Sequence, residues 1–273
     1  MFVTTDDSKY VLRVYPRDAK GNQEIILELD FMSVLRREDL PVPKVIPSLA
    51  KDTLVIADIE GHTWQCVLME YASGSHPTTY TPALIKHMAY LQAKMHTIGA
   101  AYAQSHELPQ AIDTLKESVA AGRLLQDKNI DPYYREYLER VKDYEVGLDD
   151  TLPIGLSHFD YDIDNLFVQN DKVTAVLDFG DVSCMPLIVC LGYTLWDILF
   201  EEAGSAKLMA IYLQTYQETR QLTPGEKNIL AQIILFRHYV ISAIRINFGS
   251  YSHKDLDKAI QQEKYLKNLI VSF

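Results

Sequence analysis

The sequence has 273 residues and a formal net charge of −11, from 37 acidic and 26 basic side chains. This length allows one large or two modest domains with hydrophobic cores, so neither a disulfide nor a metal is needed to hold the fold. The acidic balance repels phosphate backbones and anionic lipids, so we expect neither nucleic acid nor a membrane as partner. It is compatible with a cationic small-molecule substrate, although many proteins are acidic for solubility alone.

The cysteines and the apolar stretches point to a reducing compartment. Cys66, Cys184 and Cys190 lie in apolar surroundings without C-x-x-C spacing, which is typical of free thiols. Residues 1–7 contain neither a basic region nor a sustained apolar run, so no signal peptide is predicted. The longest apolar stretch, 187–200, is interrupted by polar residues and is too short to span a bilayer. We therefore expect a cytoplasmic protein.

The first seventy residues predict a small sheet with one helix against it. Residues 2–15 alternate apolar and polar side chains around a polar centre at 6–8, which predicts a β-hairpin. Apolar residues at helical spacing predict a helix over 23–37, ended by the prolines that follow it. Further extended runs cover 53–58 and 64–70.

After residue 74 the pattern becomes mainly helical. Thr81 is a predicted N-cap, with a proline at the first helical position after it. Residues 154–180 interrupt the helices with a β-rich segment that turns at Asn170-Asp171. We expect an α+β protein with an N-terminal lobe at 1–72 and a C-terminal lobe at 73–273. The predicted helices cover 109–126, 132–147, 187–203, 205–219, 224–247 and 254–271.

The β-rich segment carries the polar residues with chemical potential. Asp160 and Asn165 would share a loop, and Asp178 follows Asn165 by thirteen residues at the end of the next strand. A carboxylate and an amide oxygen that converge from two strands suit Mg²⁺, which binds few protein oxygens. A second carboxylate nearby can orient a hydroxyl nucleophile. Asp162 and Asp164 lie in the same loop, and a merely solvated acidic loop is the alternative interpretation.

The spacing H-x-D-x-x-x-x-N followed by D-F-G resembles the catalytic elements of protein kinases and of small-molecule kinases. It implies a two-lobed protein-kinase-like fold of the aminoglycoside phosphotransferase and choline kinase type, with ATP as co-substrate and Mg²⁺ as metal. In such a fold Asp160 is the catalytic carboxylate, Asn165 and Asp178 are the metal ligands, and His158 braces the loop. We expect Asp162 and Asp164 to be solvated or to face the substrate.

The resemblance extends upstream. Arg13 falls where the family has its nucleotide-phosphate lysine, and Glu28 falls where the family has the helix glutamate that pairs with it. The resemblance implies that these two residues form an ion pair, and that the backbone at Glu70 and Ala72 meets the adenine edge. Taken alone, an arginine on a strand and a glutamate on a helix are equally compatible with surface charges.

Three features depart from the family pattern. Family members usually have one more strand and a nucleotide-covering loop before the position of Phe2, so we expect this chain to begin inside the N-terminal lobe, with either a truncated start or reduced coverage of the phosphates. Arg13 replaces lysine, which changes a compact charge into a planar fork. Cys190 stands where relatives commonly carry an aspartate that braces the catalytic loop, and its loss would loosen Asp160.

The expected function is ATP- and Mg²⁺-dependent phosphorylation of a hydroxyl on a small molecule, such as an aminoglycoside, an amino alcohol, a hydroxy amino acid or a sugar. A helix predicted from residue 187 leaves little room for peptide docking after the D-F-G element. Acidic acceptor contacts could come from Asp181, Asp197, Glu201 and Glu202. We expect at least two of the last three to be ordinary helix-surface charges instead. The alternatives are a nucleotide-binding regulatory pseudokinase without turnover, and a metal-dependent hydrolase that reuses Asp160, Asn165 and Asp178.

Overall fold

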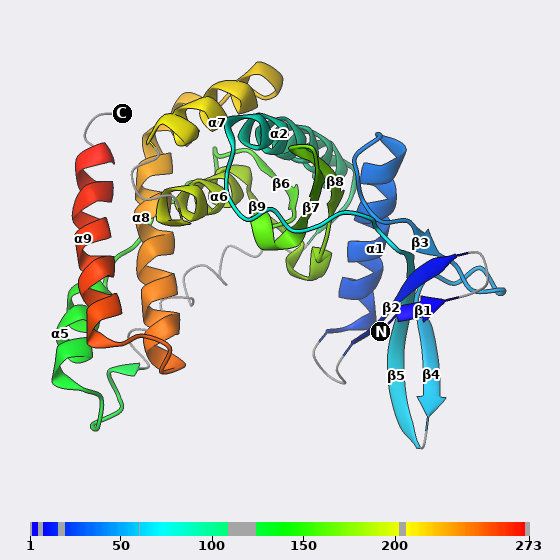
Figure 1. Cartoon of the computed structure of the whole chain (residues 1–273), viewed down its shortest axis with the longest axis horizontal. Coiled ribbons are helices and arrows are strands. Elements are labelled where there is room, and N and C mark those ends of the chain that lie inside the picture. The colour runs from blue at the N-terminus through cyan, green and yellow to red at the C-terminus, as the bar shows by residue number, and fades with distance from the viewer. Residues whose placement is uncertain are drawn as a thin grey trace.

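The computed structural model of the chain shows two lobes (Figure 1). It describes residues 2–4, 8–15, 20–59, 61–108, 124–201 and 206–270. The small lobe holds an antiparallel sheet and one helix, and the larger lobe is mainly helical. This confirms the predicted α+β, protein-kinase-like architecture, while the boundary at residue 72 stays a prediction.

The small-lobe sheet is antiparallel throughout its described strands. The strand order is β1-β2-β5-β3, and β4 also pairs with β5. The register places Arg13 opposite Val67 and Tyr10 opposite Glu70. The predicted hairpin is confirmed, whereas the two-residue β3 was not predicted because so short a strand has no alternation. The strands are β1 (Phe2–Thr4), β2 (Lys9–Tyr15), β3 (Val45–Ile46), β4 (Val55–Ile59) and β5 (His62–Glu70).

Helix α1 (Asn22–Arg37) lies between the sheet and the larger lobe (Figure 1). The Glu24 carboxylate accepts a hydrogen bond from the Gly21 backbone N–H at 2.7 Å, which satisfies one free donor at the helix start. The Phe31 ring centroid lies 6.5 Å from that of Phe179, so α1 packs directly on the D-F-G element. This contact fixes the buried face of α1, which also carries Glu28, against the catalytic segment.

The described helices of the larger lobe follow the predicted pattern closely. Thr81 caps α2 as predicted, accepting a hydrogen bond from the Leu84 N–H at 3.1 Å. The helix predicted at 132–147 ends at Val141 instead, because Tyr144 and Val146 still pack against the core and extend the apolar pattern beyond the helix. The helix predicted at 109–126 lies largely outside the described residues. The helices are α2 (Pro82–Ser105), α5 (Pro132–Val141), α6 (Leu187–Glu201), α7 (Ala206–Thr219), α8 (Pro224–Asn247) and α9 (His253–Ile270).

Two short β-ribbons hold the catalytic segment between the helices. Strand β6 (Ile154–Ser157) pairs with β9 (Ser183–Pro186), and β7 (Leu166–Gln169) pairs with β8 (Lys172–Val176). The turn after β7 uses Asn170 and Asp171, both with positive φ, as predicted. Strand β9 was missed because its four residues have no alternation. A Cβ at Gly99 of α2 would overlap the Leu156 carbonyl oxygen, so β6 lies directly on α2.

Helix α8 is long and apolar enough to cross a membrane, the one such helix in the described ranges. In its most apolar window, 67% of the residues are buried. The helix packs against α6 and α9 within the larger lobe (Figure 1). This burial is typical of the core helix of a globular domain, in which apolar length serves packing.

Candidate active site

A cleft of about 620 Å³ lies between the two lobes. This volume is within the range of small-molecule and cofactor sites. Four of the predicted site residues line the cleft: Arg13, Glu70, Ala72 and Asp178. The full lining is Val11, Leu12, Arg13, Val14, Met32, Pro43, Met69, Glu70, Tyr71, Ala72, Phe167, Val176, Leu177, Asp178 and Phe179. The cleft is therefore apolar along most of its walls and charged at one end.

The end of β5 and the residues that follow it line another part of the cleft. The Glu70 backbone N–H donates to the Lys44 carbonyl at 2.8 Å, and the Glu70 carboxylate pairs with Arg36 at 3.3 Å. In the part of the chain that the structure describes, no hydrogen bond engages the Ala72 N–H. Glu70 is thus held in place, while the backbone at Ala72 has a donor available at the wall of the cleft.

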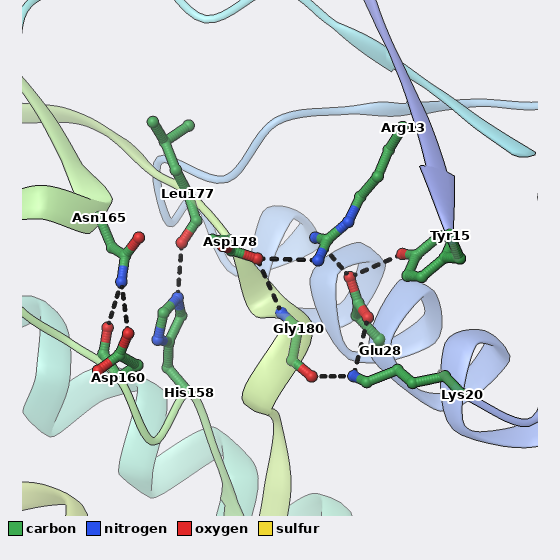
Figure 2. A network of polar contacts seen from close by, with 10 residues as sticks. All are labelled: Arg13, Tyr15, Lys20, Glu28, His158, Asp160, Asn165, Leu177, Asp178 and Gly180. Carbon is green, nitrogen blue, oxygen red and sulfur yellow. Dashed lines mark hydrogen bonds and ion pairs between the residues drawn. The ribbon is translucent and has the colours of Figure 1, made fainter. Parts of the chain in front are cut away.

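At the charged end, Glu28 of α1 gathers three donors (Figure 2). Arg13 Nη1 lies 3.1 Å from Glu28 Oε1, which is the predicted ion pair. The Tyr15 hydroxyl donates to the same oxygen at 3.0 Å, and Lys20 Nζ lies 3.4 Å from Oε2. Lys20 also donates to the Gly180 carbonyl. Glu28 is only 2% exposed, so these contacts compensate for the burial of its charge.

Tyr15 and Lys20 were not predicted from the sequence. Tyr15 follows Arg13 by two residues on one strand, so period-two alternation puts both on the same face and could have identified it. Burial and the charge of Glu28 raise the pKa of Tyr15, which keeps its hydroxyl protonated as a donor. No local pattern marks Lys20, whose partner Gly180 lies 160 residues away.

Arg13 also joins the small lobe to Asp178. Its Nη2 lies 2.9 Å from Asp178 Oδ1, so one guanidinium bridges Glu28 and Asp178 (Figure 2). Asp178 adopts the left-handed backbone conformation, with φ of 53°. Beside it, a Cβ on Gly180 would lie 2.7 Å from Arg13 Nη2, so only glycine fits there without displacing the arginine. The Asp178 side chain remains 61% exposed, which leaves its carboxylate open to a ligand.

His158 ties the catalytic loop to the strand that leads into Asp178. Its Nε2 donates to the Leu177 carbonyl at 2.7 Å (Figure 2). Its ring also lies 4.6 Å from the Phe179 ring. Burial lowers the pKa of His158, so the ring is neutral at pH 7 and carries its hydrogen on Nε2. Among the described residues nothing hydrogen-bonds Nδ1. These contacts support the predicted bracing role.

Asn165 holds Asp160. Its Nδ2 donates to the Asp160 carbonyl at 2.9 Å and to Asp160 Oδ2 at 3.0 Å, while its amide oxygen points away from Asp160 (Figure 2). That oxygen and the exposed Asp178 carboxylate are the hard donors that Mg²⁺ prefers. No group of three or more His, Cys, Asp or Glu side chains with metal-binding geometry occurs in the described ranges. The donor set therefore fits a cation that takes few protein ligands.

Asp162 differs from its predicted solvated or substrate-facing position. Its carboxylate accepts hydrogen bonds from the backbone N–H groups of Asp164 at 2.8 Å and Asn165 at 3.2 Å. It thus caps the short 3₁₀ turn Ile163–Asn165, whereas Asp164 is exposed as expected. Burial and the neighbouring charge of Asp160 raise the pKa of Asp162 to about 6. The sequence showed the carboxylates but not which of them faces the backbone.

Cys190 keeps contact with the catalytic loop. The residue is buried on α6, and Ser157 and Phe159 are among the neighbours that act on its thiol. Burial raises the pKa of the thiol to about 12, so it stays neutral. Phe159 has a φ of 66°, and Cys190 therefore touches the loop at its left-handed residue. The expected loosening of Asp160 stays a prediction.

Arg237 of α8 is a site residue that the sequence did not indicate. Its Nη2 lies 3.7 Å from Asp160 Oδ1, and its guanidinium lies 4.4 Å from the centroid of the Tyr193 ring. The arginine lies in an apolar helix 77 residues from Asp160, and no local spacing connects them. Asp181 is exposed and Asp197 half-buried; Glu202 and the Glu201 side chain lie outside the described residues.

Together, the two lobes, the cleft and the catalytic loop define a protein of the protein-kinase-like class. A model described as the phosphotransferase enzyme family matches residues 1–225, and the chain belongs to this family. Homoserine kinase from Methylobacillus flagellatus is 24% identical over 232 residues, which cover 82% of this chain and 68% of that enzyme. The predicted family and the class of small-molecule kinase are thereby confirmed.

Two solved structures share the fold. An amicoumacin kinase, hAmiN, in complex with AMP-PNP, Ca²⁺ and Ami, matches with a TM-score of 0.72 at 15% identity, covering 98% of this chain and 84% of that one. A microcompartment-associated aminopropanol kinase matches with a TM-score of 0.66 at 21% identity, covering 98% and 87%.

Proposed function

We propose that the protein transfers the γ-phosphoryl group of ATP, in a Mg²⁺-dependent reaction, to a hydroxyl group of a small molecule. The observation that carries this proposal is the bridge from Glu28 through Arg13 to Asp178 at the charged end of the cleft. It puts a cation and a potential metal ligand together on the nucleotide side of the loop that carries Asp160. A nucleotide with its adenine at the Ala72 backbone would direct its phosphates toward this cation.

Different residues would contact the phosphates and the metal ion. Arg13 is held by Glu28 on one nitrogen and by Asp178 on the other, so its guanidinium is aimed before the phosphates arrive. Asn165 and Asp178 would hold Mg²⁺, which neutralises phosphate charge when bound. Lys20, beside Glu28, adds a second positive charge on the same side of the cleft.

Asp160 is the group proposed to act on the acceptor. Phosphoryl transfer passes through a loose transition state, so the protein must chiefly hold the acceptor hydroxyl in line and take its proton late. The Asp160 carboxylate is fixed through Oδ2 by Asn165, which leaves Oδ1 to face the acceptor side. The His158 contact to Leu177 keeps the whole loop in register with Asp178.

The named relatives suggest which acceptors to test. Homoserine kinase and aminopropanol kinase bring hydroxy amino acids and amino alcohols into the acceptor panel. Aminoglycosides and sugars complete it, because the family model covers phosphotransferases in general.

The metal and nucleotide assignment is tested by Asp178→Ala. Isothermal titration calorimetry of ATP with and without Mg²⁺ should show that Mg²⁺ enhances binding to the wild type and no longer does so in this variant. Asp164→Ala is the matched control, since it removes an exposed carboxylate beside Asn165. Circular dichroism of both variants checks the fold. Unchanged Mg²⁺ enhancement in Asp178→Ala would contradict the assignment.

Turnover separates the enzyme from the regulatory alternative. Release of ADP should be measured with Mg-ATP and each member of the acceptor panel. Acceptor-stimulated ADP release supports the transferase. Tight Mg-ATP binding without turnover on the panel supports a regulatory protein, and activity without any nucleotide supports a hydrolase.

A further inference from the structure

Building on the phosphotransferase function above, we propose that Arg237 binds a carboxylate of the acceptor, so that the substrate is a small hydroxylated acid. Arg237 lies on α8 and approaches Asp160 from the larger lobe. It is absent from the lining of the nucleotide cleft. Asp160 is absent from that lining as well, and we assign both residues to the acceptor side.

The rings around Arg237 hold its side chain in place but do not use the N–H donors along the edge of its guanidinium. The guanidinium lies over the Tyr193 ring at 4.4 Å and near the Trp196 ring at 5.8 Å, and the side chain is 15% exposed. Stacking on aromatic rings holds the guanidinium plane in one orientation while leaving its edge free. The ring contacts therefore prepare an arginine fork for a planar ligand.

The hydrogen-bonding capacity of this fork is almost unused. Its one ionic contact in the described structure, with Asp160 Oδ1, spans 3.7 Å, which is longer than a hydrogen bond. The Nε atom is buried and has no hydrogen-bond partner among the described residues. A guanidinium offers five N–H donors, and leaving them unpaired in a buried place is costly. A ligand anion would satisfy them, and a carboxylate matches the planar fork with two oxygens.

The geometry also limits the size of the acceptor. Adding a hydrogen bond of about 2.8 Å at each end to the 3.7 Å between Arg237 Nη2 and Asp160 Oδ1 places the acceptor hydroxyl and a carboxylate oxygen bound to Nη2 at most about 9 Å apart. A short carbon chain spans this distance. Binding of the carboxylate would also draw the guanidinium charge away from Asp160, leaving that carboxylate to accept the hydroxyl proton.

The test compares pairs of acceptors that differ by the carboxylate. L-Homoserine is paired with 3-aminopropan-1-ol, and L-serine with 2-aminoethanol, each at saturating Mg-ATP. In at least one pair the wild type should favour the acid by about 10- to 100-fold in kcat/KM, and Arg237→Met should bring that ratio close to one. This ratio of kcat/KM values is decisive, because an effect of the substitution on Asp160 or on ATP binding would change both acceptors equally and would cancel in the ratio. Arg237→Lys keeps the charge but not the fork, and should retain part of the preference.

Arg245→Met is the matched control. Arg245 lies on the same helix and packs on the rings of Phe200 and Tyr251, away from Asp160. In this variant the ratio of kcat/KM for each acid to that for its decarboxylated partner should equal the wild-type ratio. A preference for the decarboxylated compound in both pairs, or an equal loss for both members of each pair in Arg237→Met, would overturn the proposal. The second result would assign Arg237 to Asp160 or to the phosphates instead.

A binding measurement keeps the two proposals separable. If no acceptor is phosphorylated, the transferase function fails, and Arg237 is then examined by thermal shift of the full chain with the same four compounds. Stabilisation of the wild type by the acids alone, lost in Arg237→Met, supports a carboxylate site without turnover. An equal response to acids and amino alcohols, or no response to any compound, overturns it.

Discussion

The two lobes each contain a buried glutamate paired with an arginine, and the two pairs are built differently. In the small lobe, Glu28 holds Arg13, which is 29% exposed and faces the cleft. In the larger lobe, Glu226 is 0% exposed and binds Arg220 at 2.7 Å, inside the protein. The Glu226 carboxylate also accepts a hydrogen bond from the Thr223 N–H at the start of α8.

From the Glu226 pair, a linear series of hydrogen bonds continues toward the catalytic loop. Arg220 donates to the Tyr216 hydroxyl at 3.1 Å, which lies 2.6 Å from His96 Nδ1. His96 Nε2 then lies 3.0 Å from the Ser157 hydroxyl, next to the catalytic loop. Burial, with the nearby charge of Arg220, lowers the pKa of His96, so the chain carries no further charge. The same pair of residue types is thus enclosed within the larger lobe, where we expect it to serve stability, and faces the cleft in the small lobe, where we propose that it serves binding.

The largest expected effect is on kcat, from substitution of the proposed catalytic carboxylate Asp160. Asp160→Asn should lower kcat by about 10²- to 10⁴-fold, because the amide still fits the loop but cannot take the hydroxyl proton. ATP affinity, measured by calorimetry, should change little. Asp162→Asn is the comparison, since its carboxylate caps a turn. Near-normal turnover in Asp160→Asn, or an equal loss in both variants, would mean that the catalytic carboxylate is misassigned.

Removing one charge from each glutamate sharpens the contrast between the lobes. Glu226→Gln leaves Arg220 buried without its counter-ion and should lower the free energy of unfolding by about 3 kcal/mol, with ATP affinity unchanged. Glu28→Gln should cost only about 1 kcal/mol, since Arg13 keeps Asp178, but should weaken ATP binding about tenfold. Urea unfolding and calorimetry on both variants measure the two quantities. The reverse pattern would refute the division of roles.

The sequence predicted the site wherever the chemistry is local. His158, Asp160, Asn165 and Asp178 lie within 21 residues, and their spacing alone suggested two loops that meet. The order of elements along the chain also allowed Glu28 to be paired with Arg13, which the structure confirms. Their roles toward nucleotide and metal stay predictions.

The site contacts that no local pattern could reveal depend on tertiary packing. Arg237 reaches Asp160 from a helix whose apolar pattern signals only burial, and the partner of Lys20 lies 160 residues away. The contact of His96 with Tyr216 joins residues 120 apart. Periodicity records which face of an element is buried, but not which distant side chain it meets. The capping role of Asp162 was missed for a related reason, because the sequence does not show which of the three carboxylates in the loop faces the backbone.

Asp162 gives the smallest expected effect, because it is a partly buried carboxylate that accepts from backbone N–H groups and has no paired cation among the described residues. Its pKa is raised from an ordinary 3.8 to about 6, first by burial and then by the charge of Asp160. Between these pH values the folded state binds more protons than the unfolded state, so stability is lost as pH rises from about 4 through about 6.

Asp162→Asn cannot ionise, and its amide oxygen can still accept from the Asp164 and Asn165 N–H groups. Relative to wild type, the variant should be near neutral at pH 4 and more stable by about 1 kcal/mol at pH 7.5, a value that allows for solvent screening of a partly exposed group. Urea unfolding of both proteins across this range measures the difference, and a difference that stays constant with pH would show that Asp162 is ionised at little cost in the folded protein.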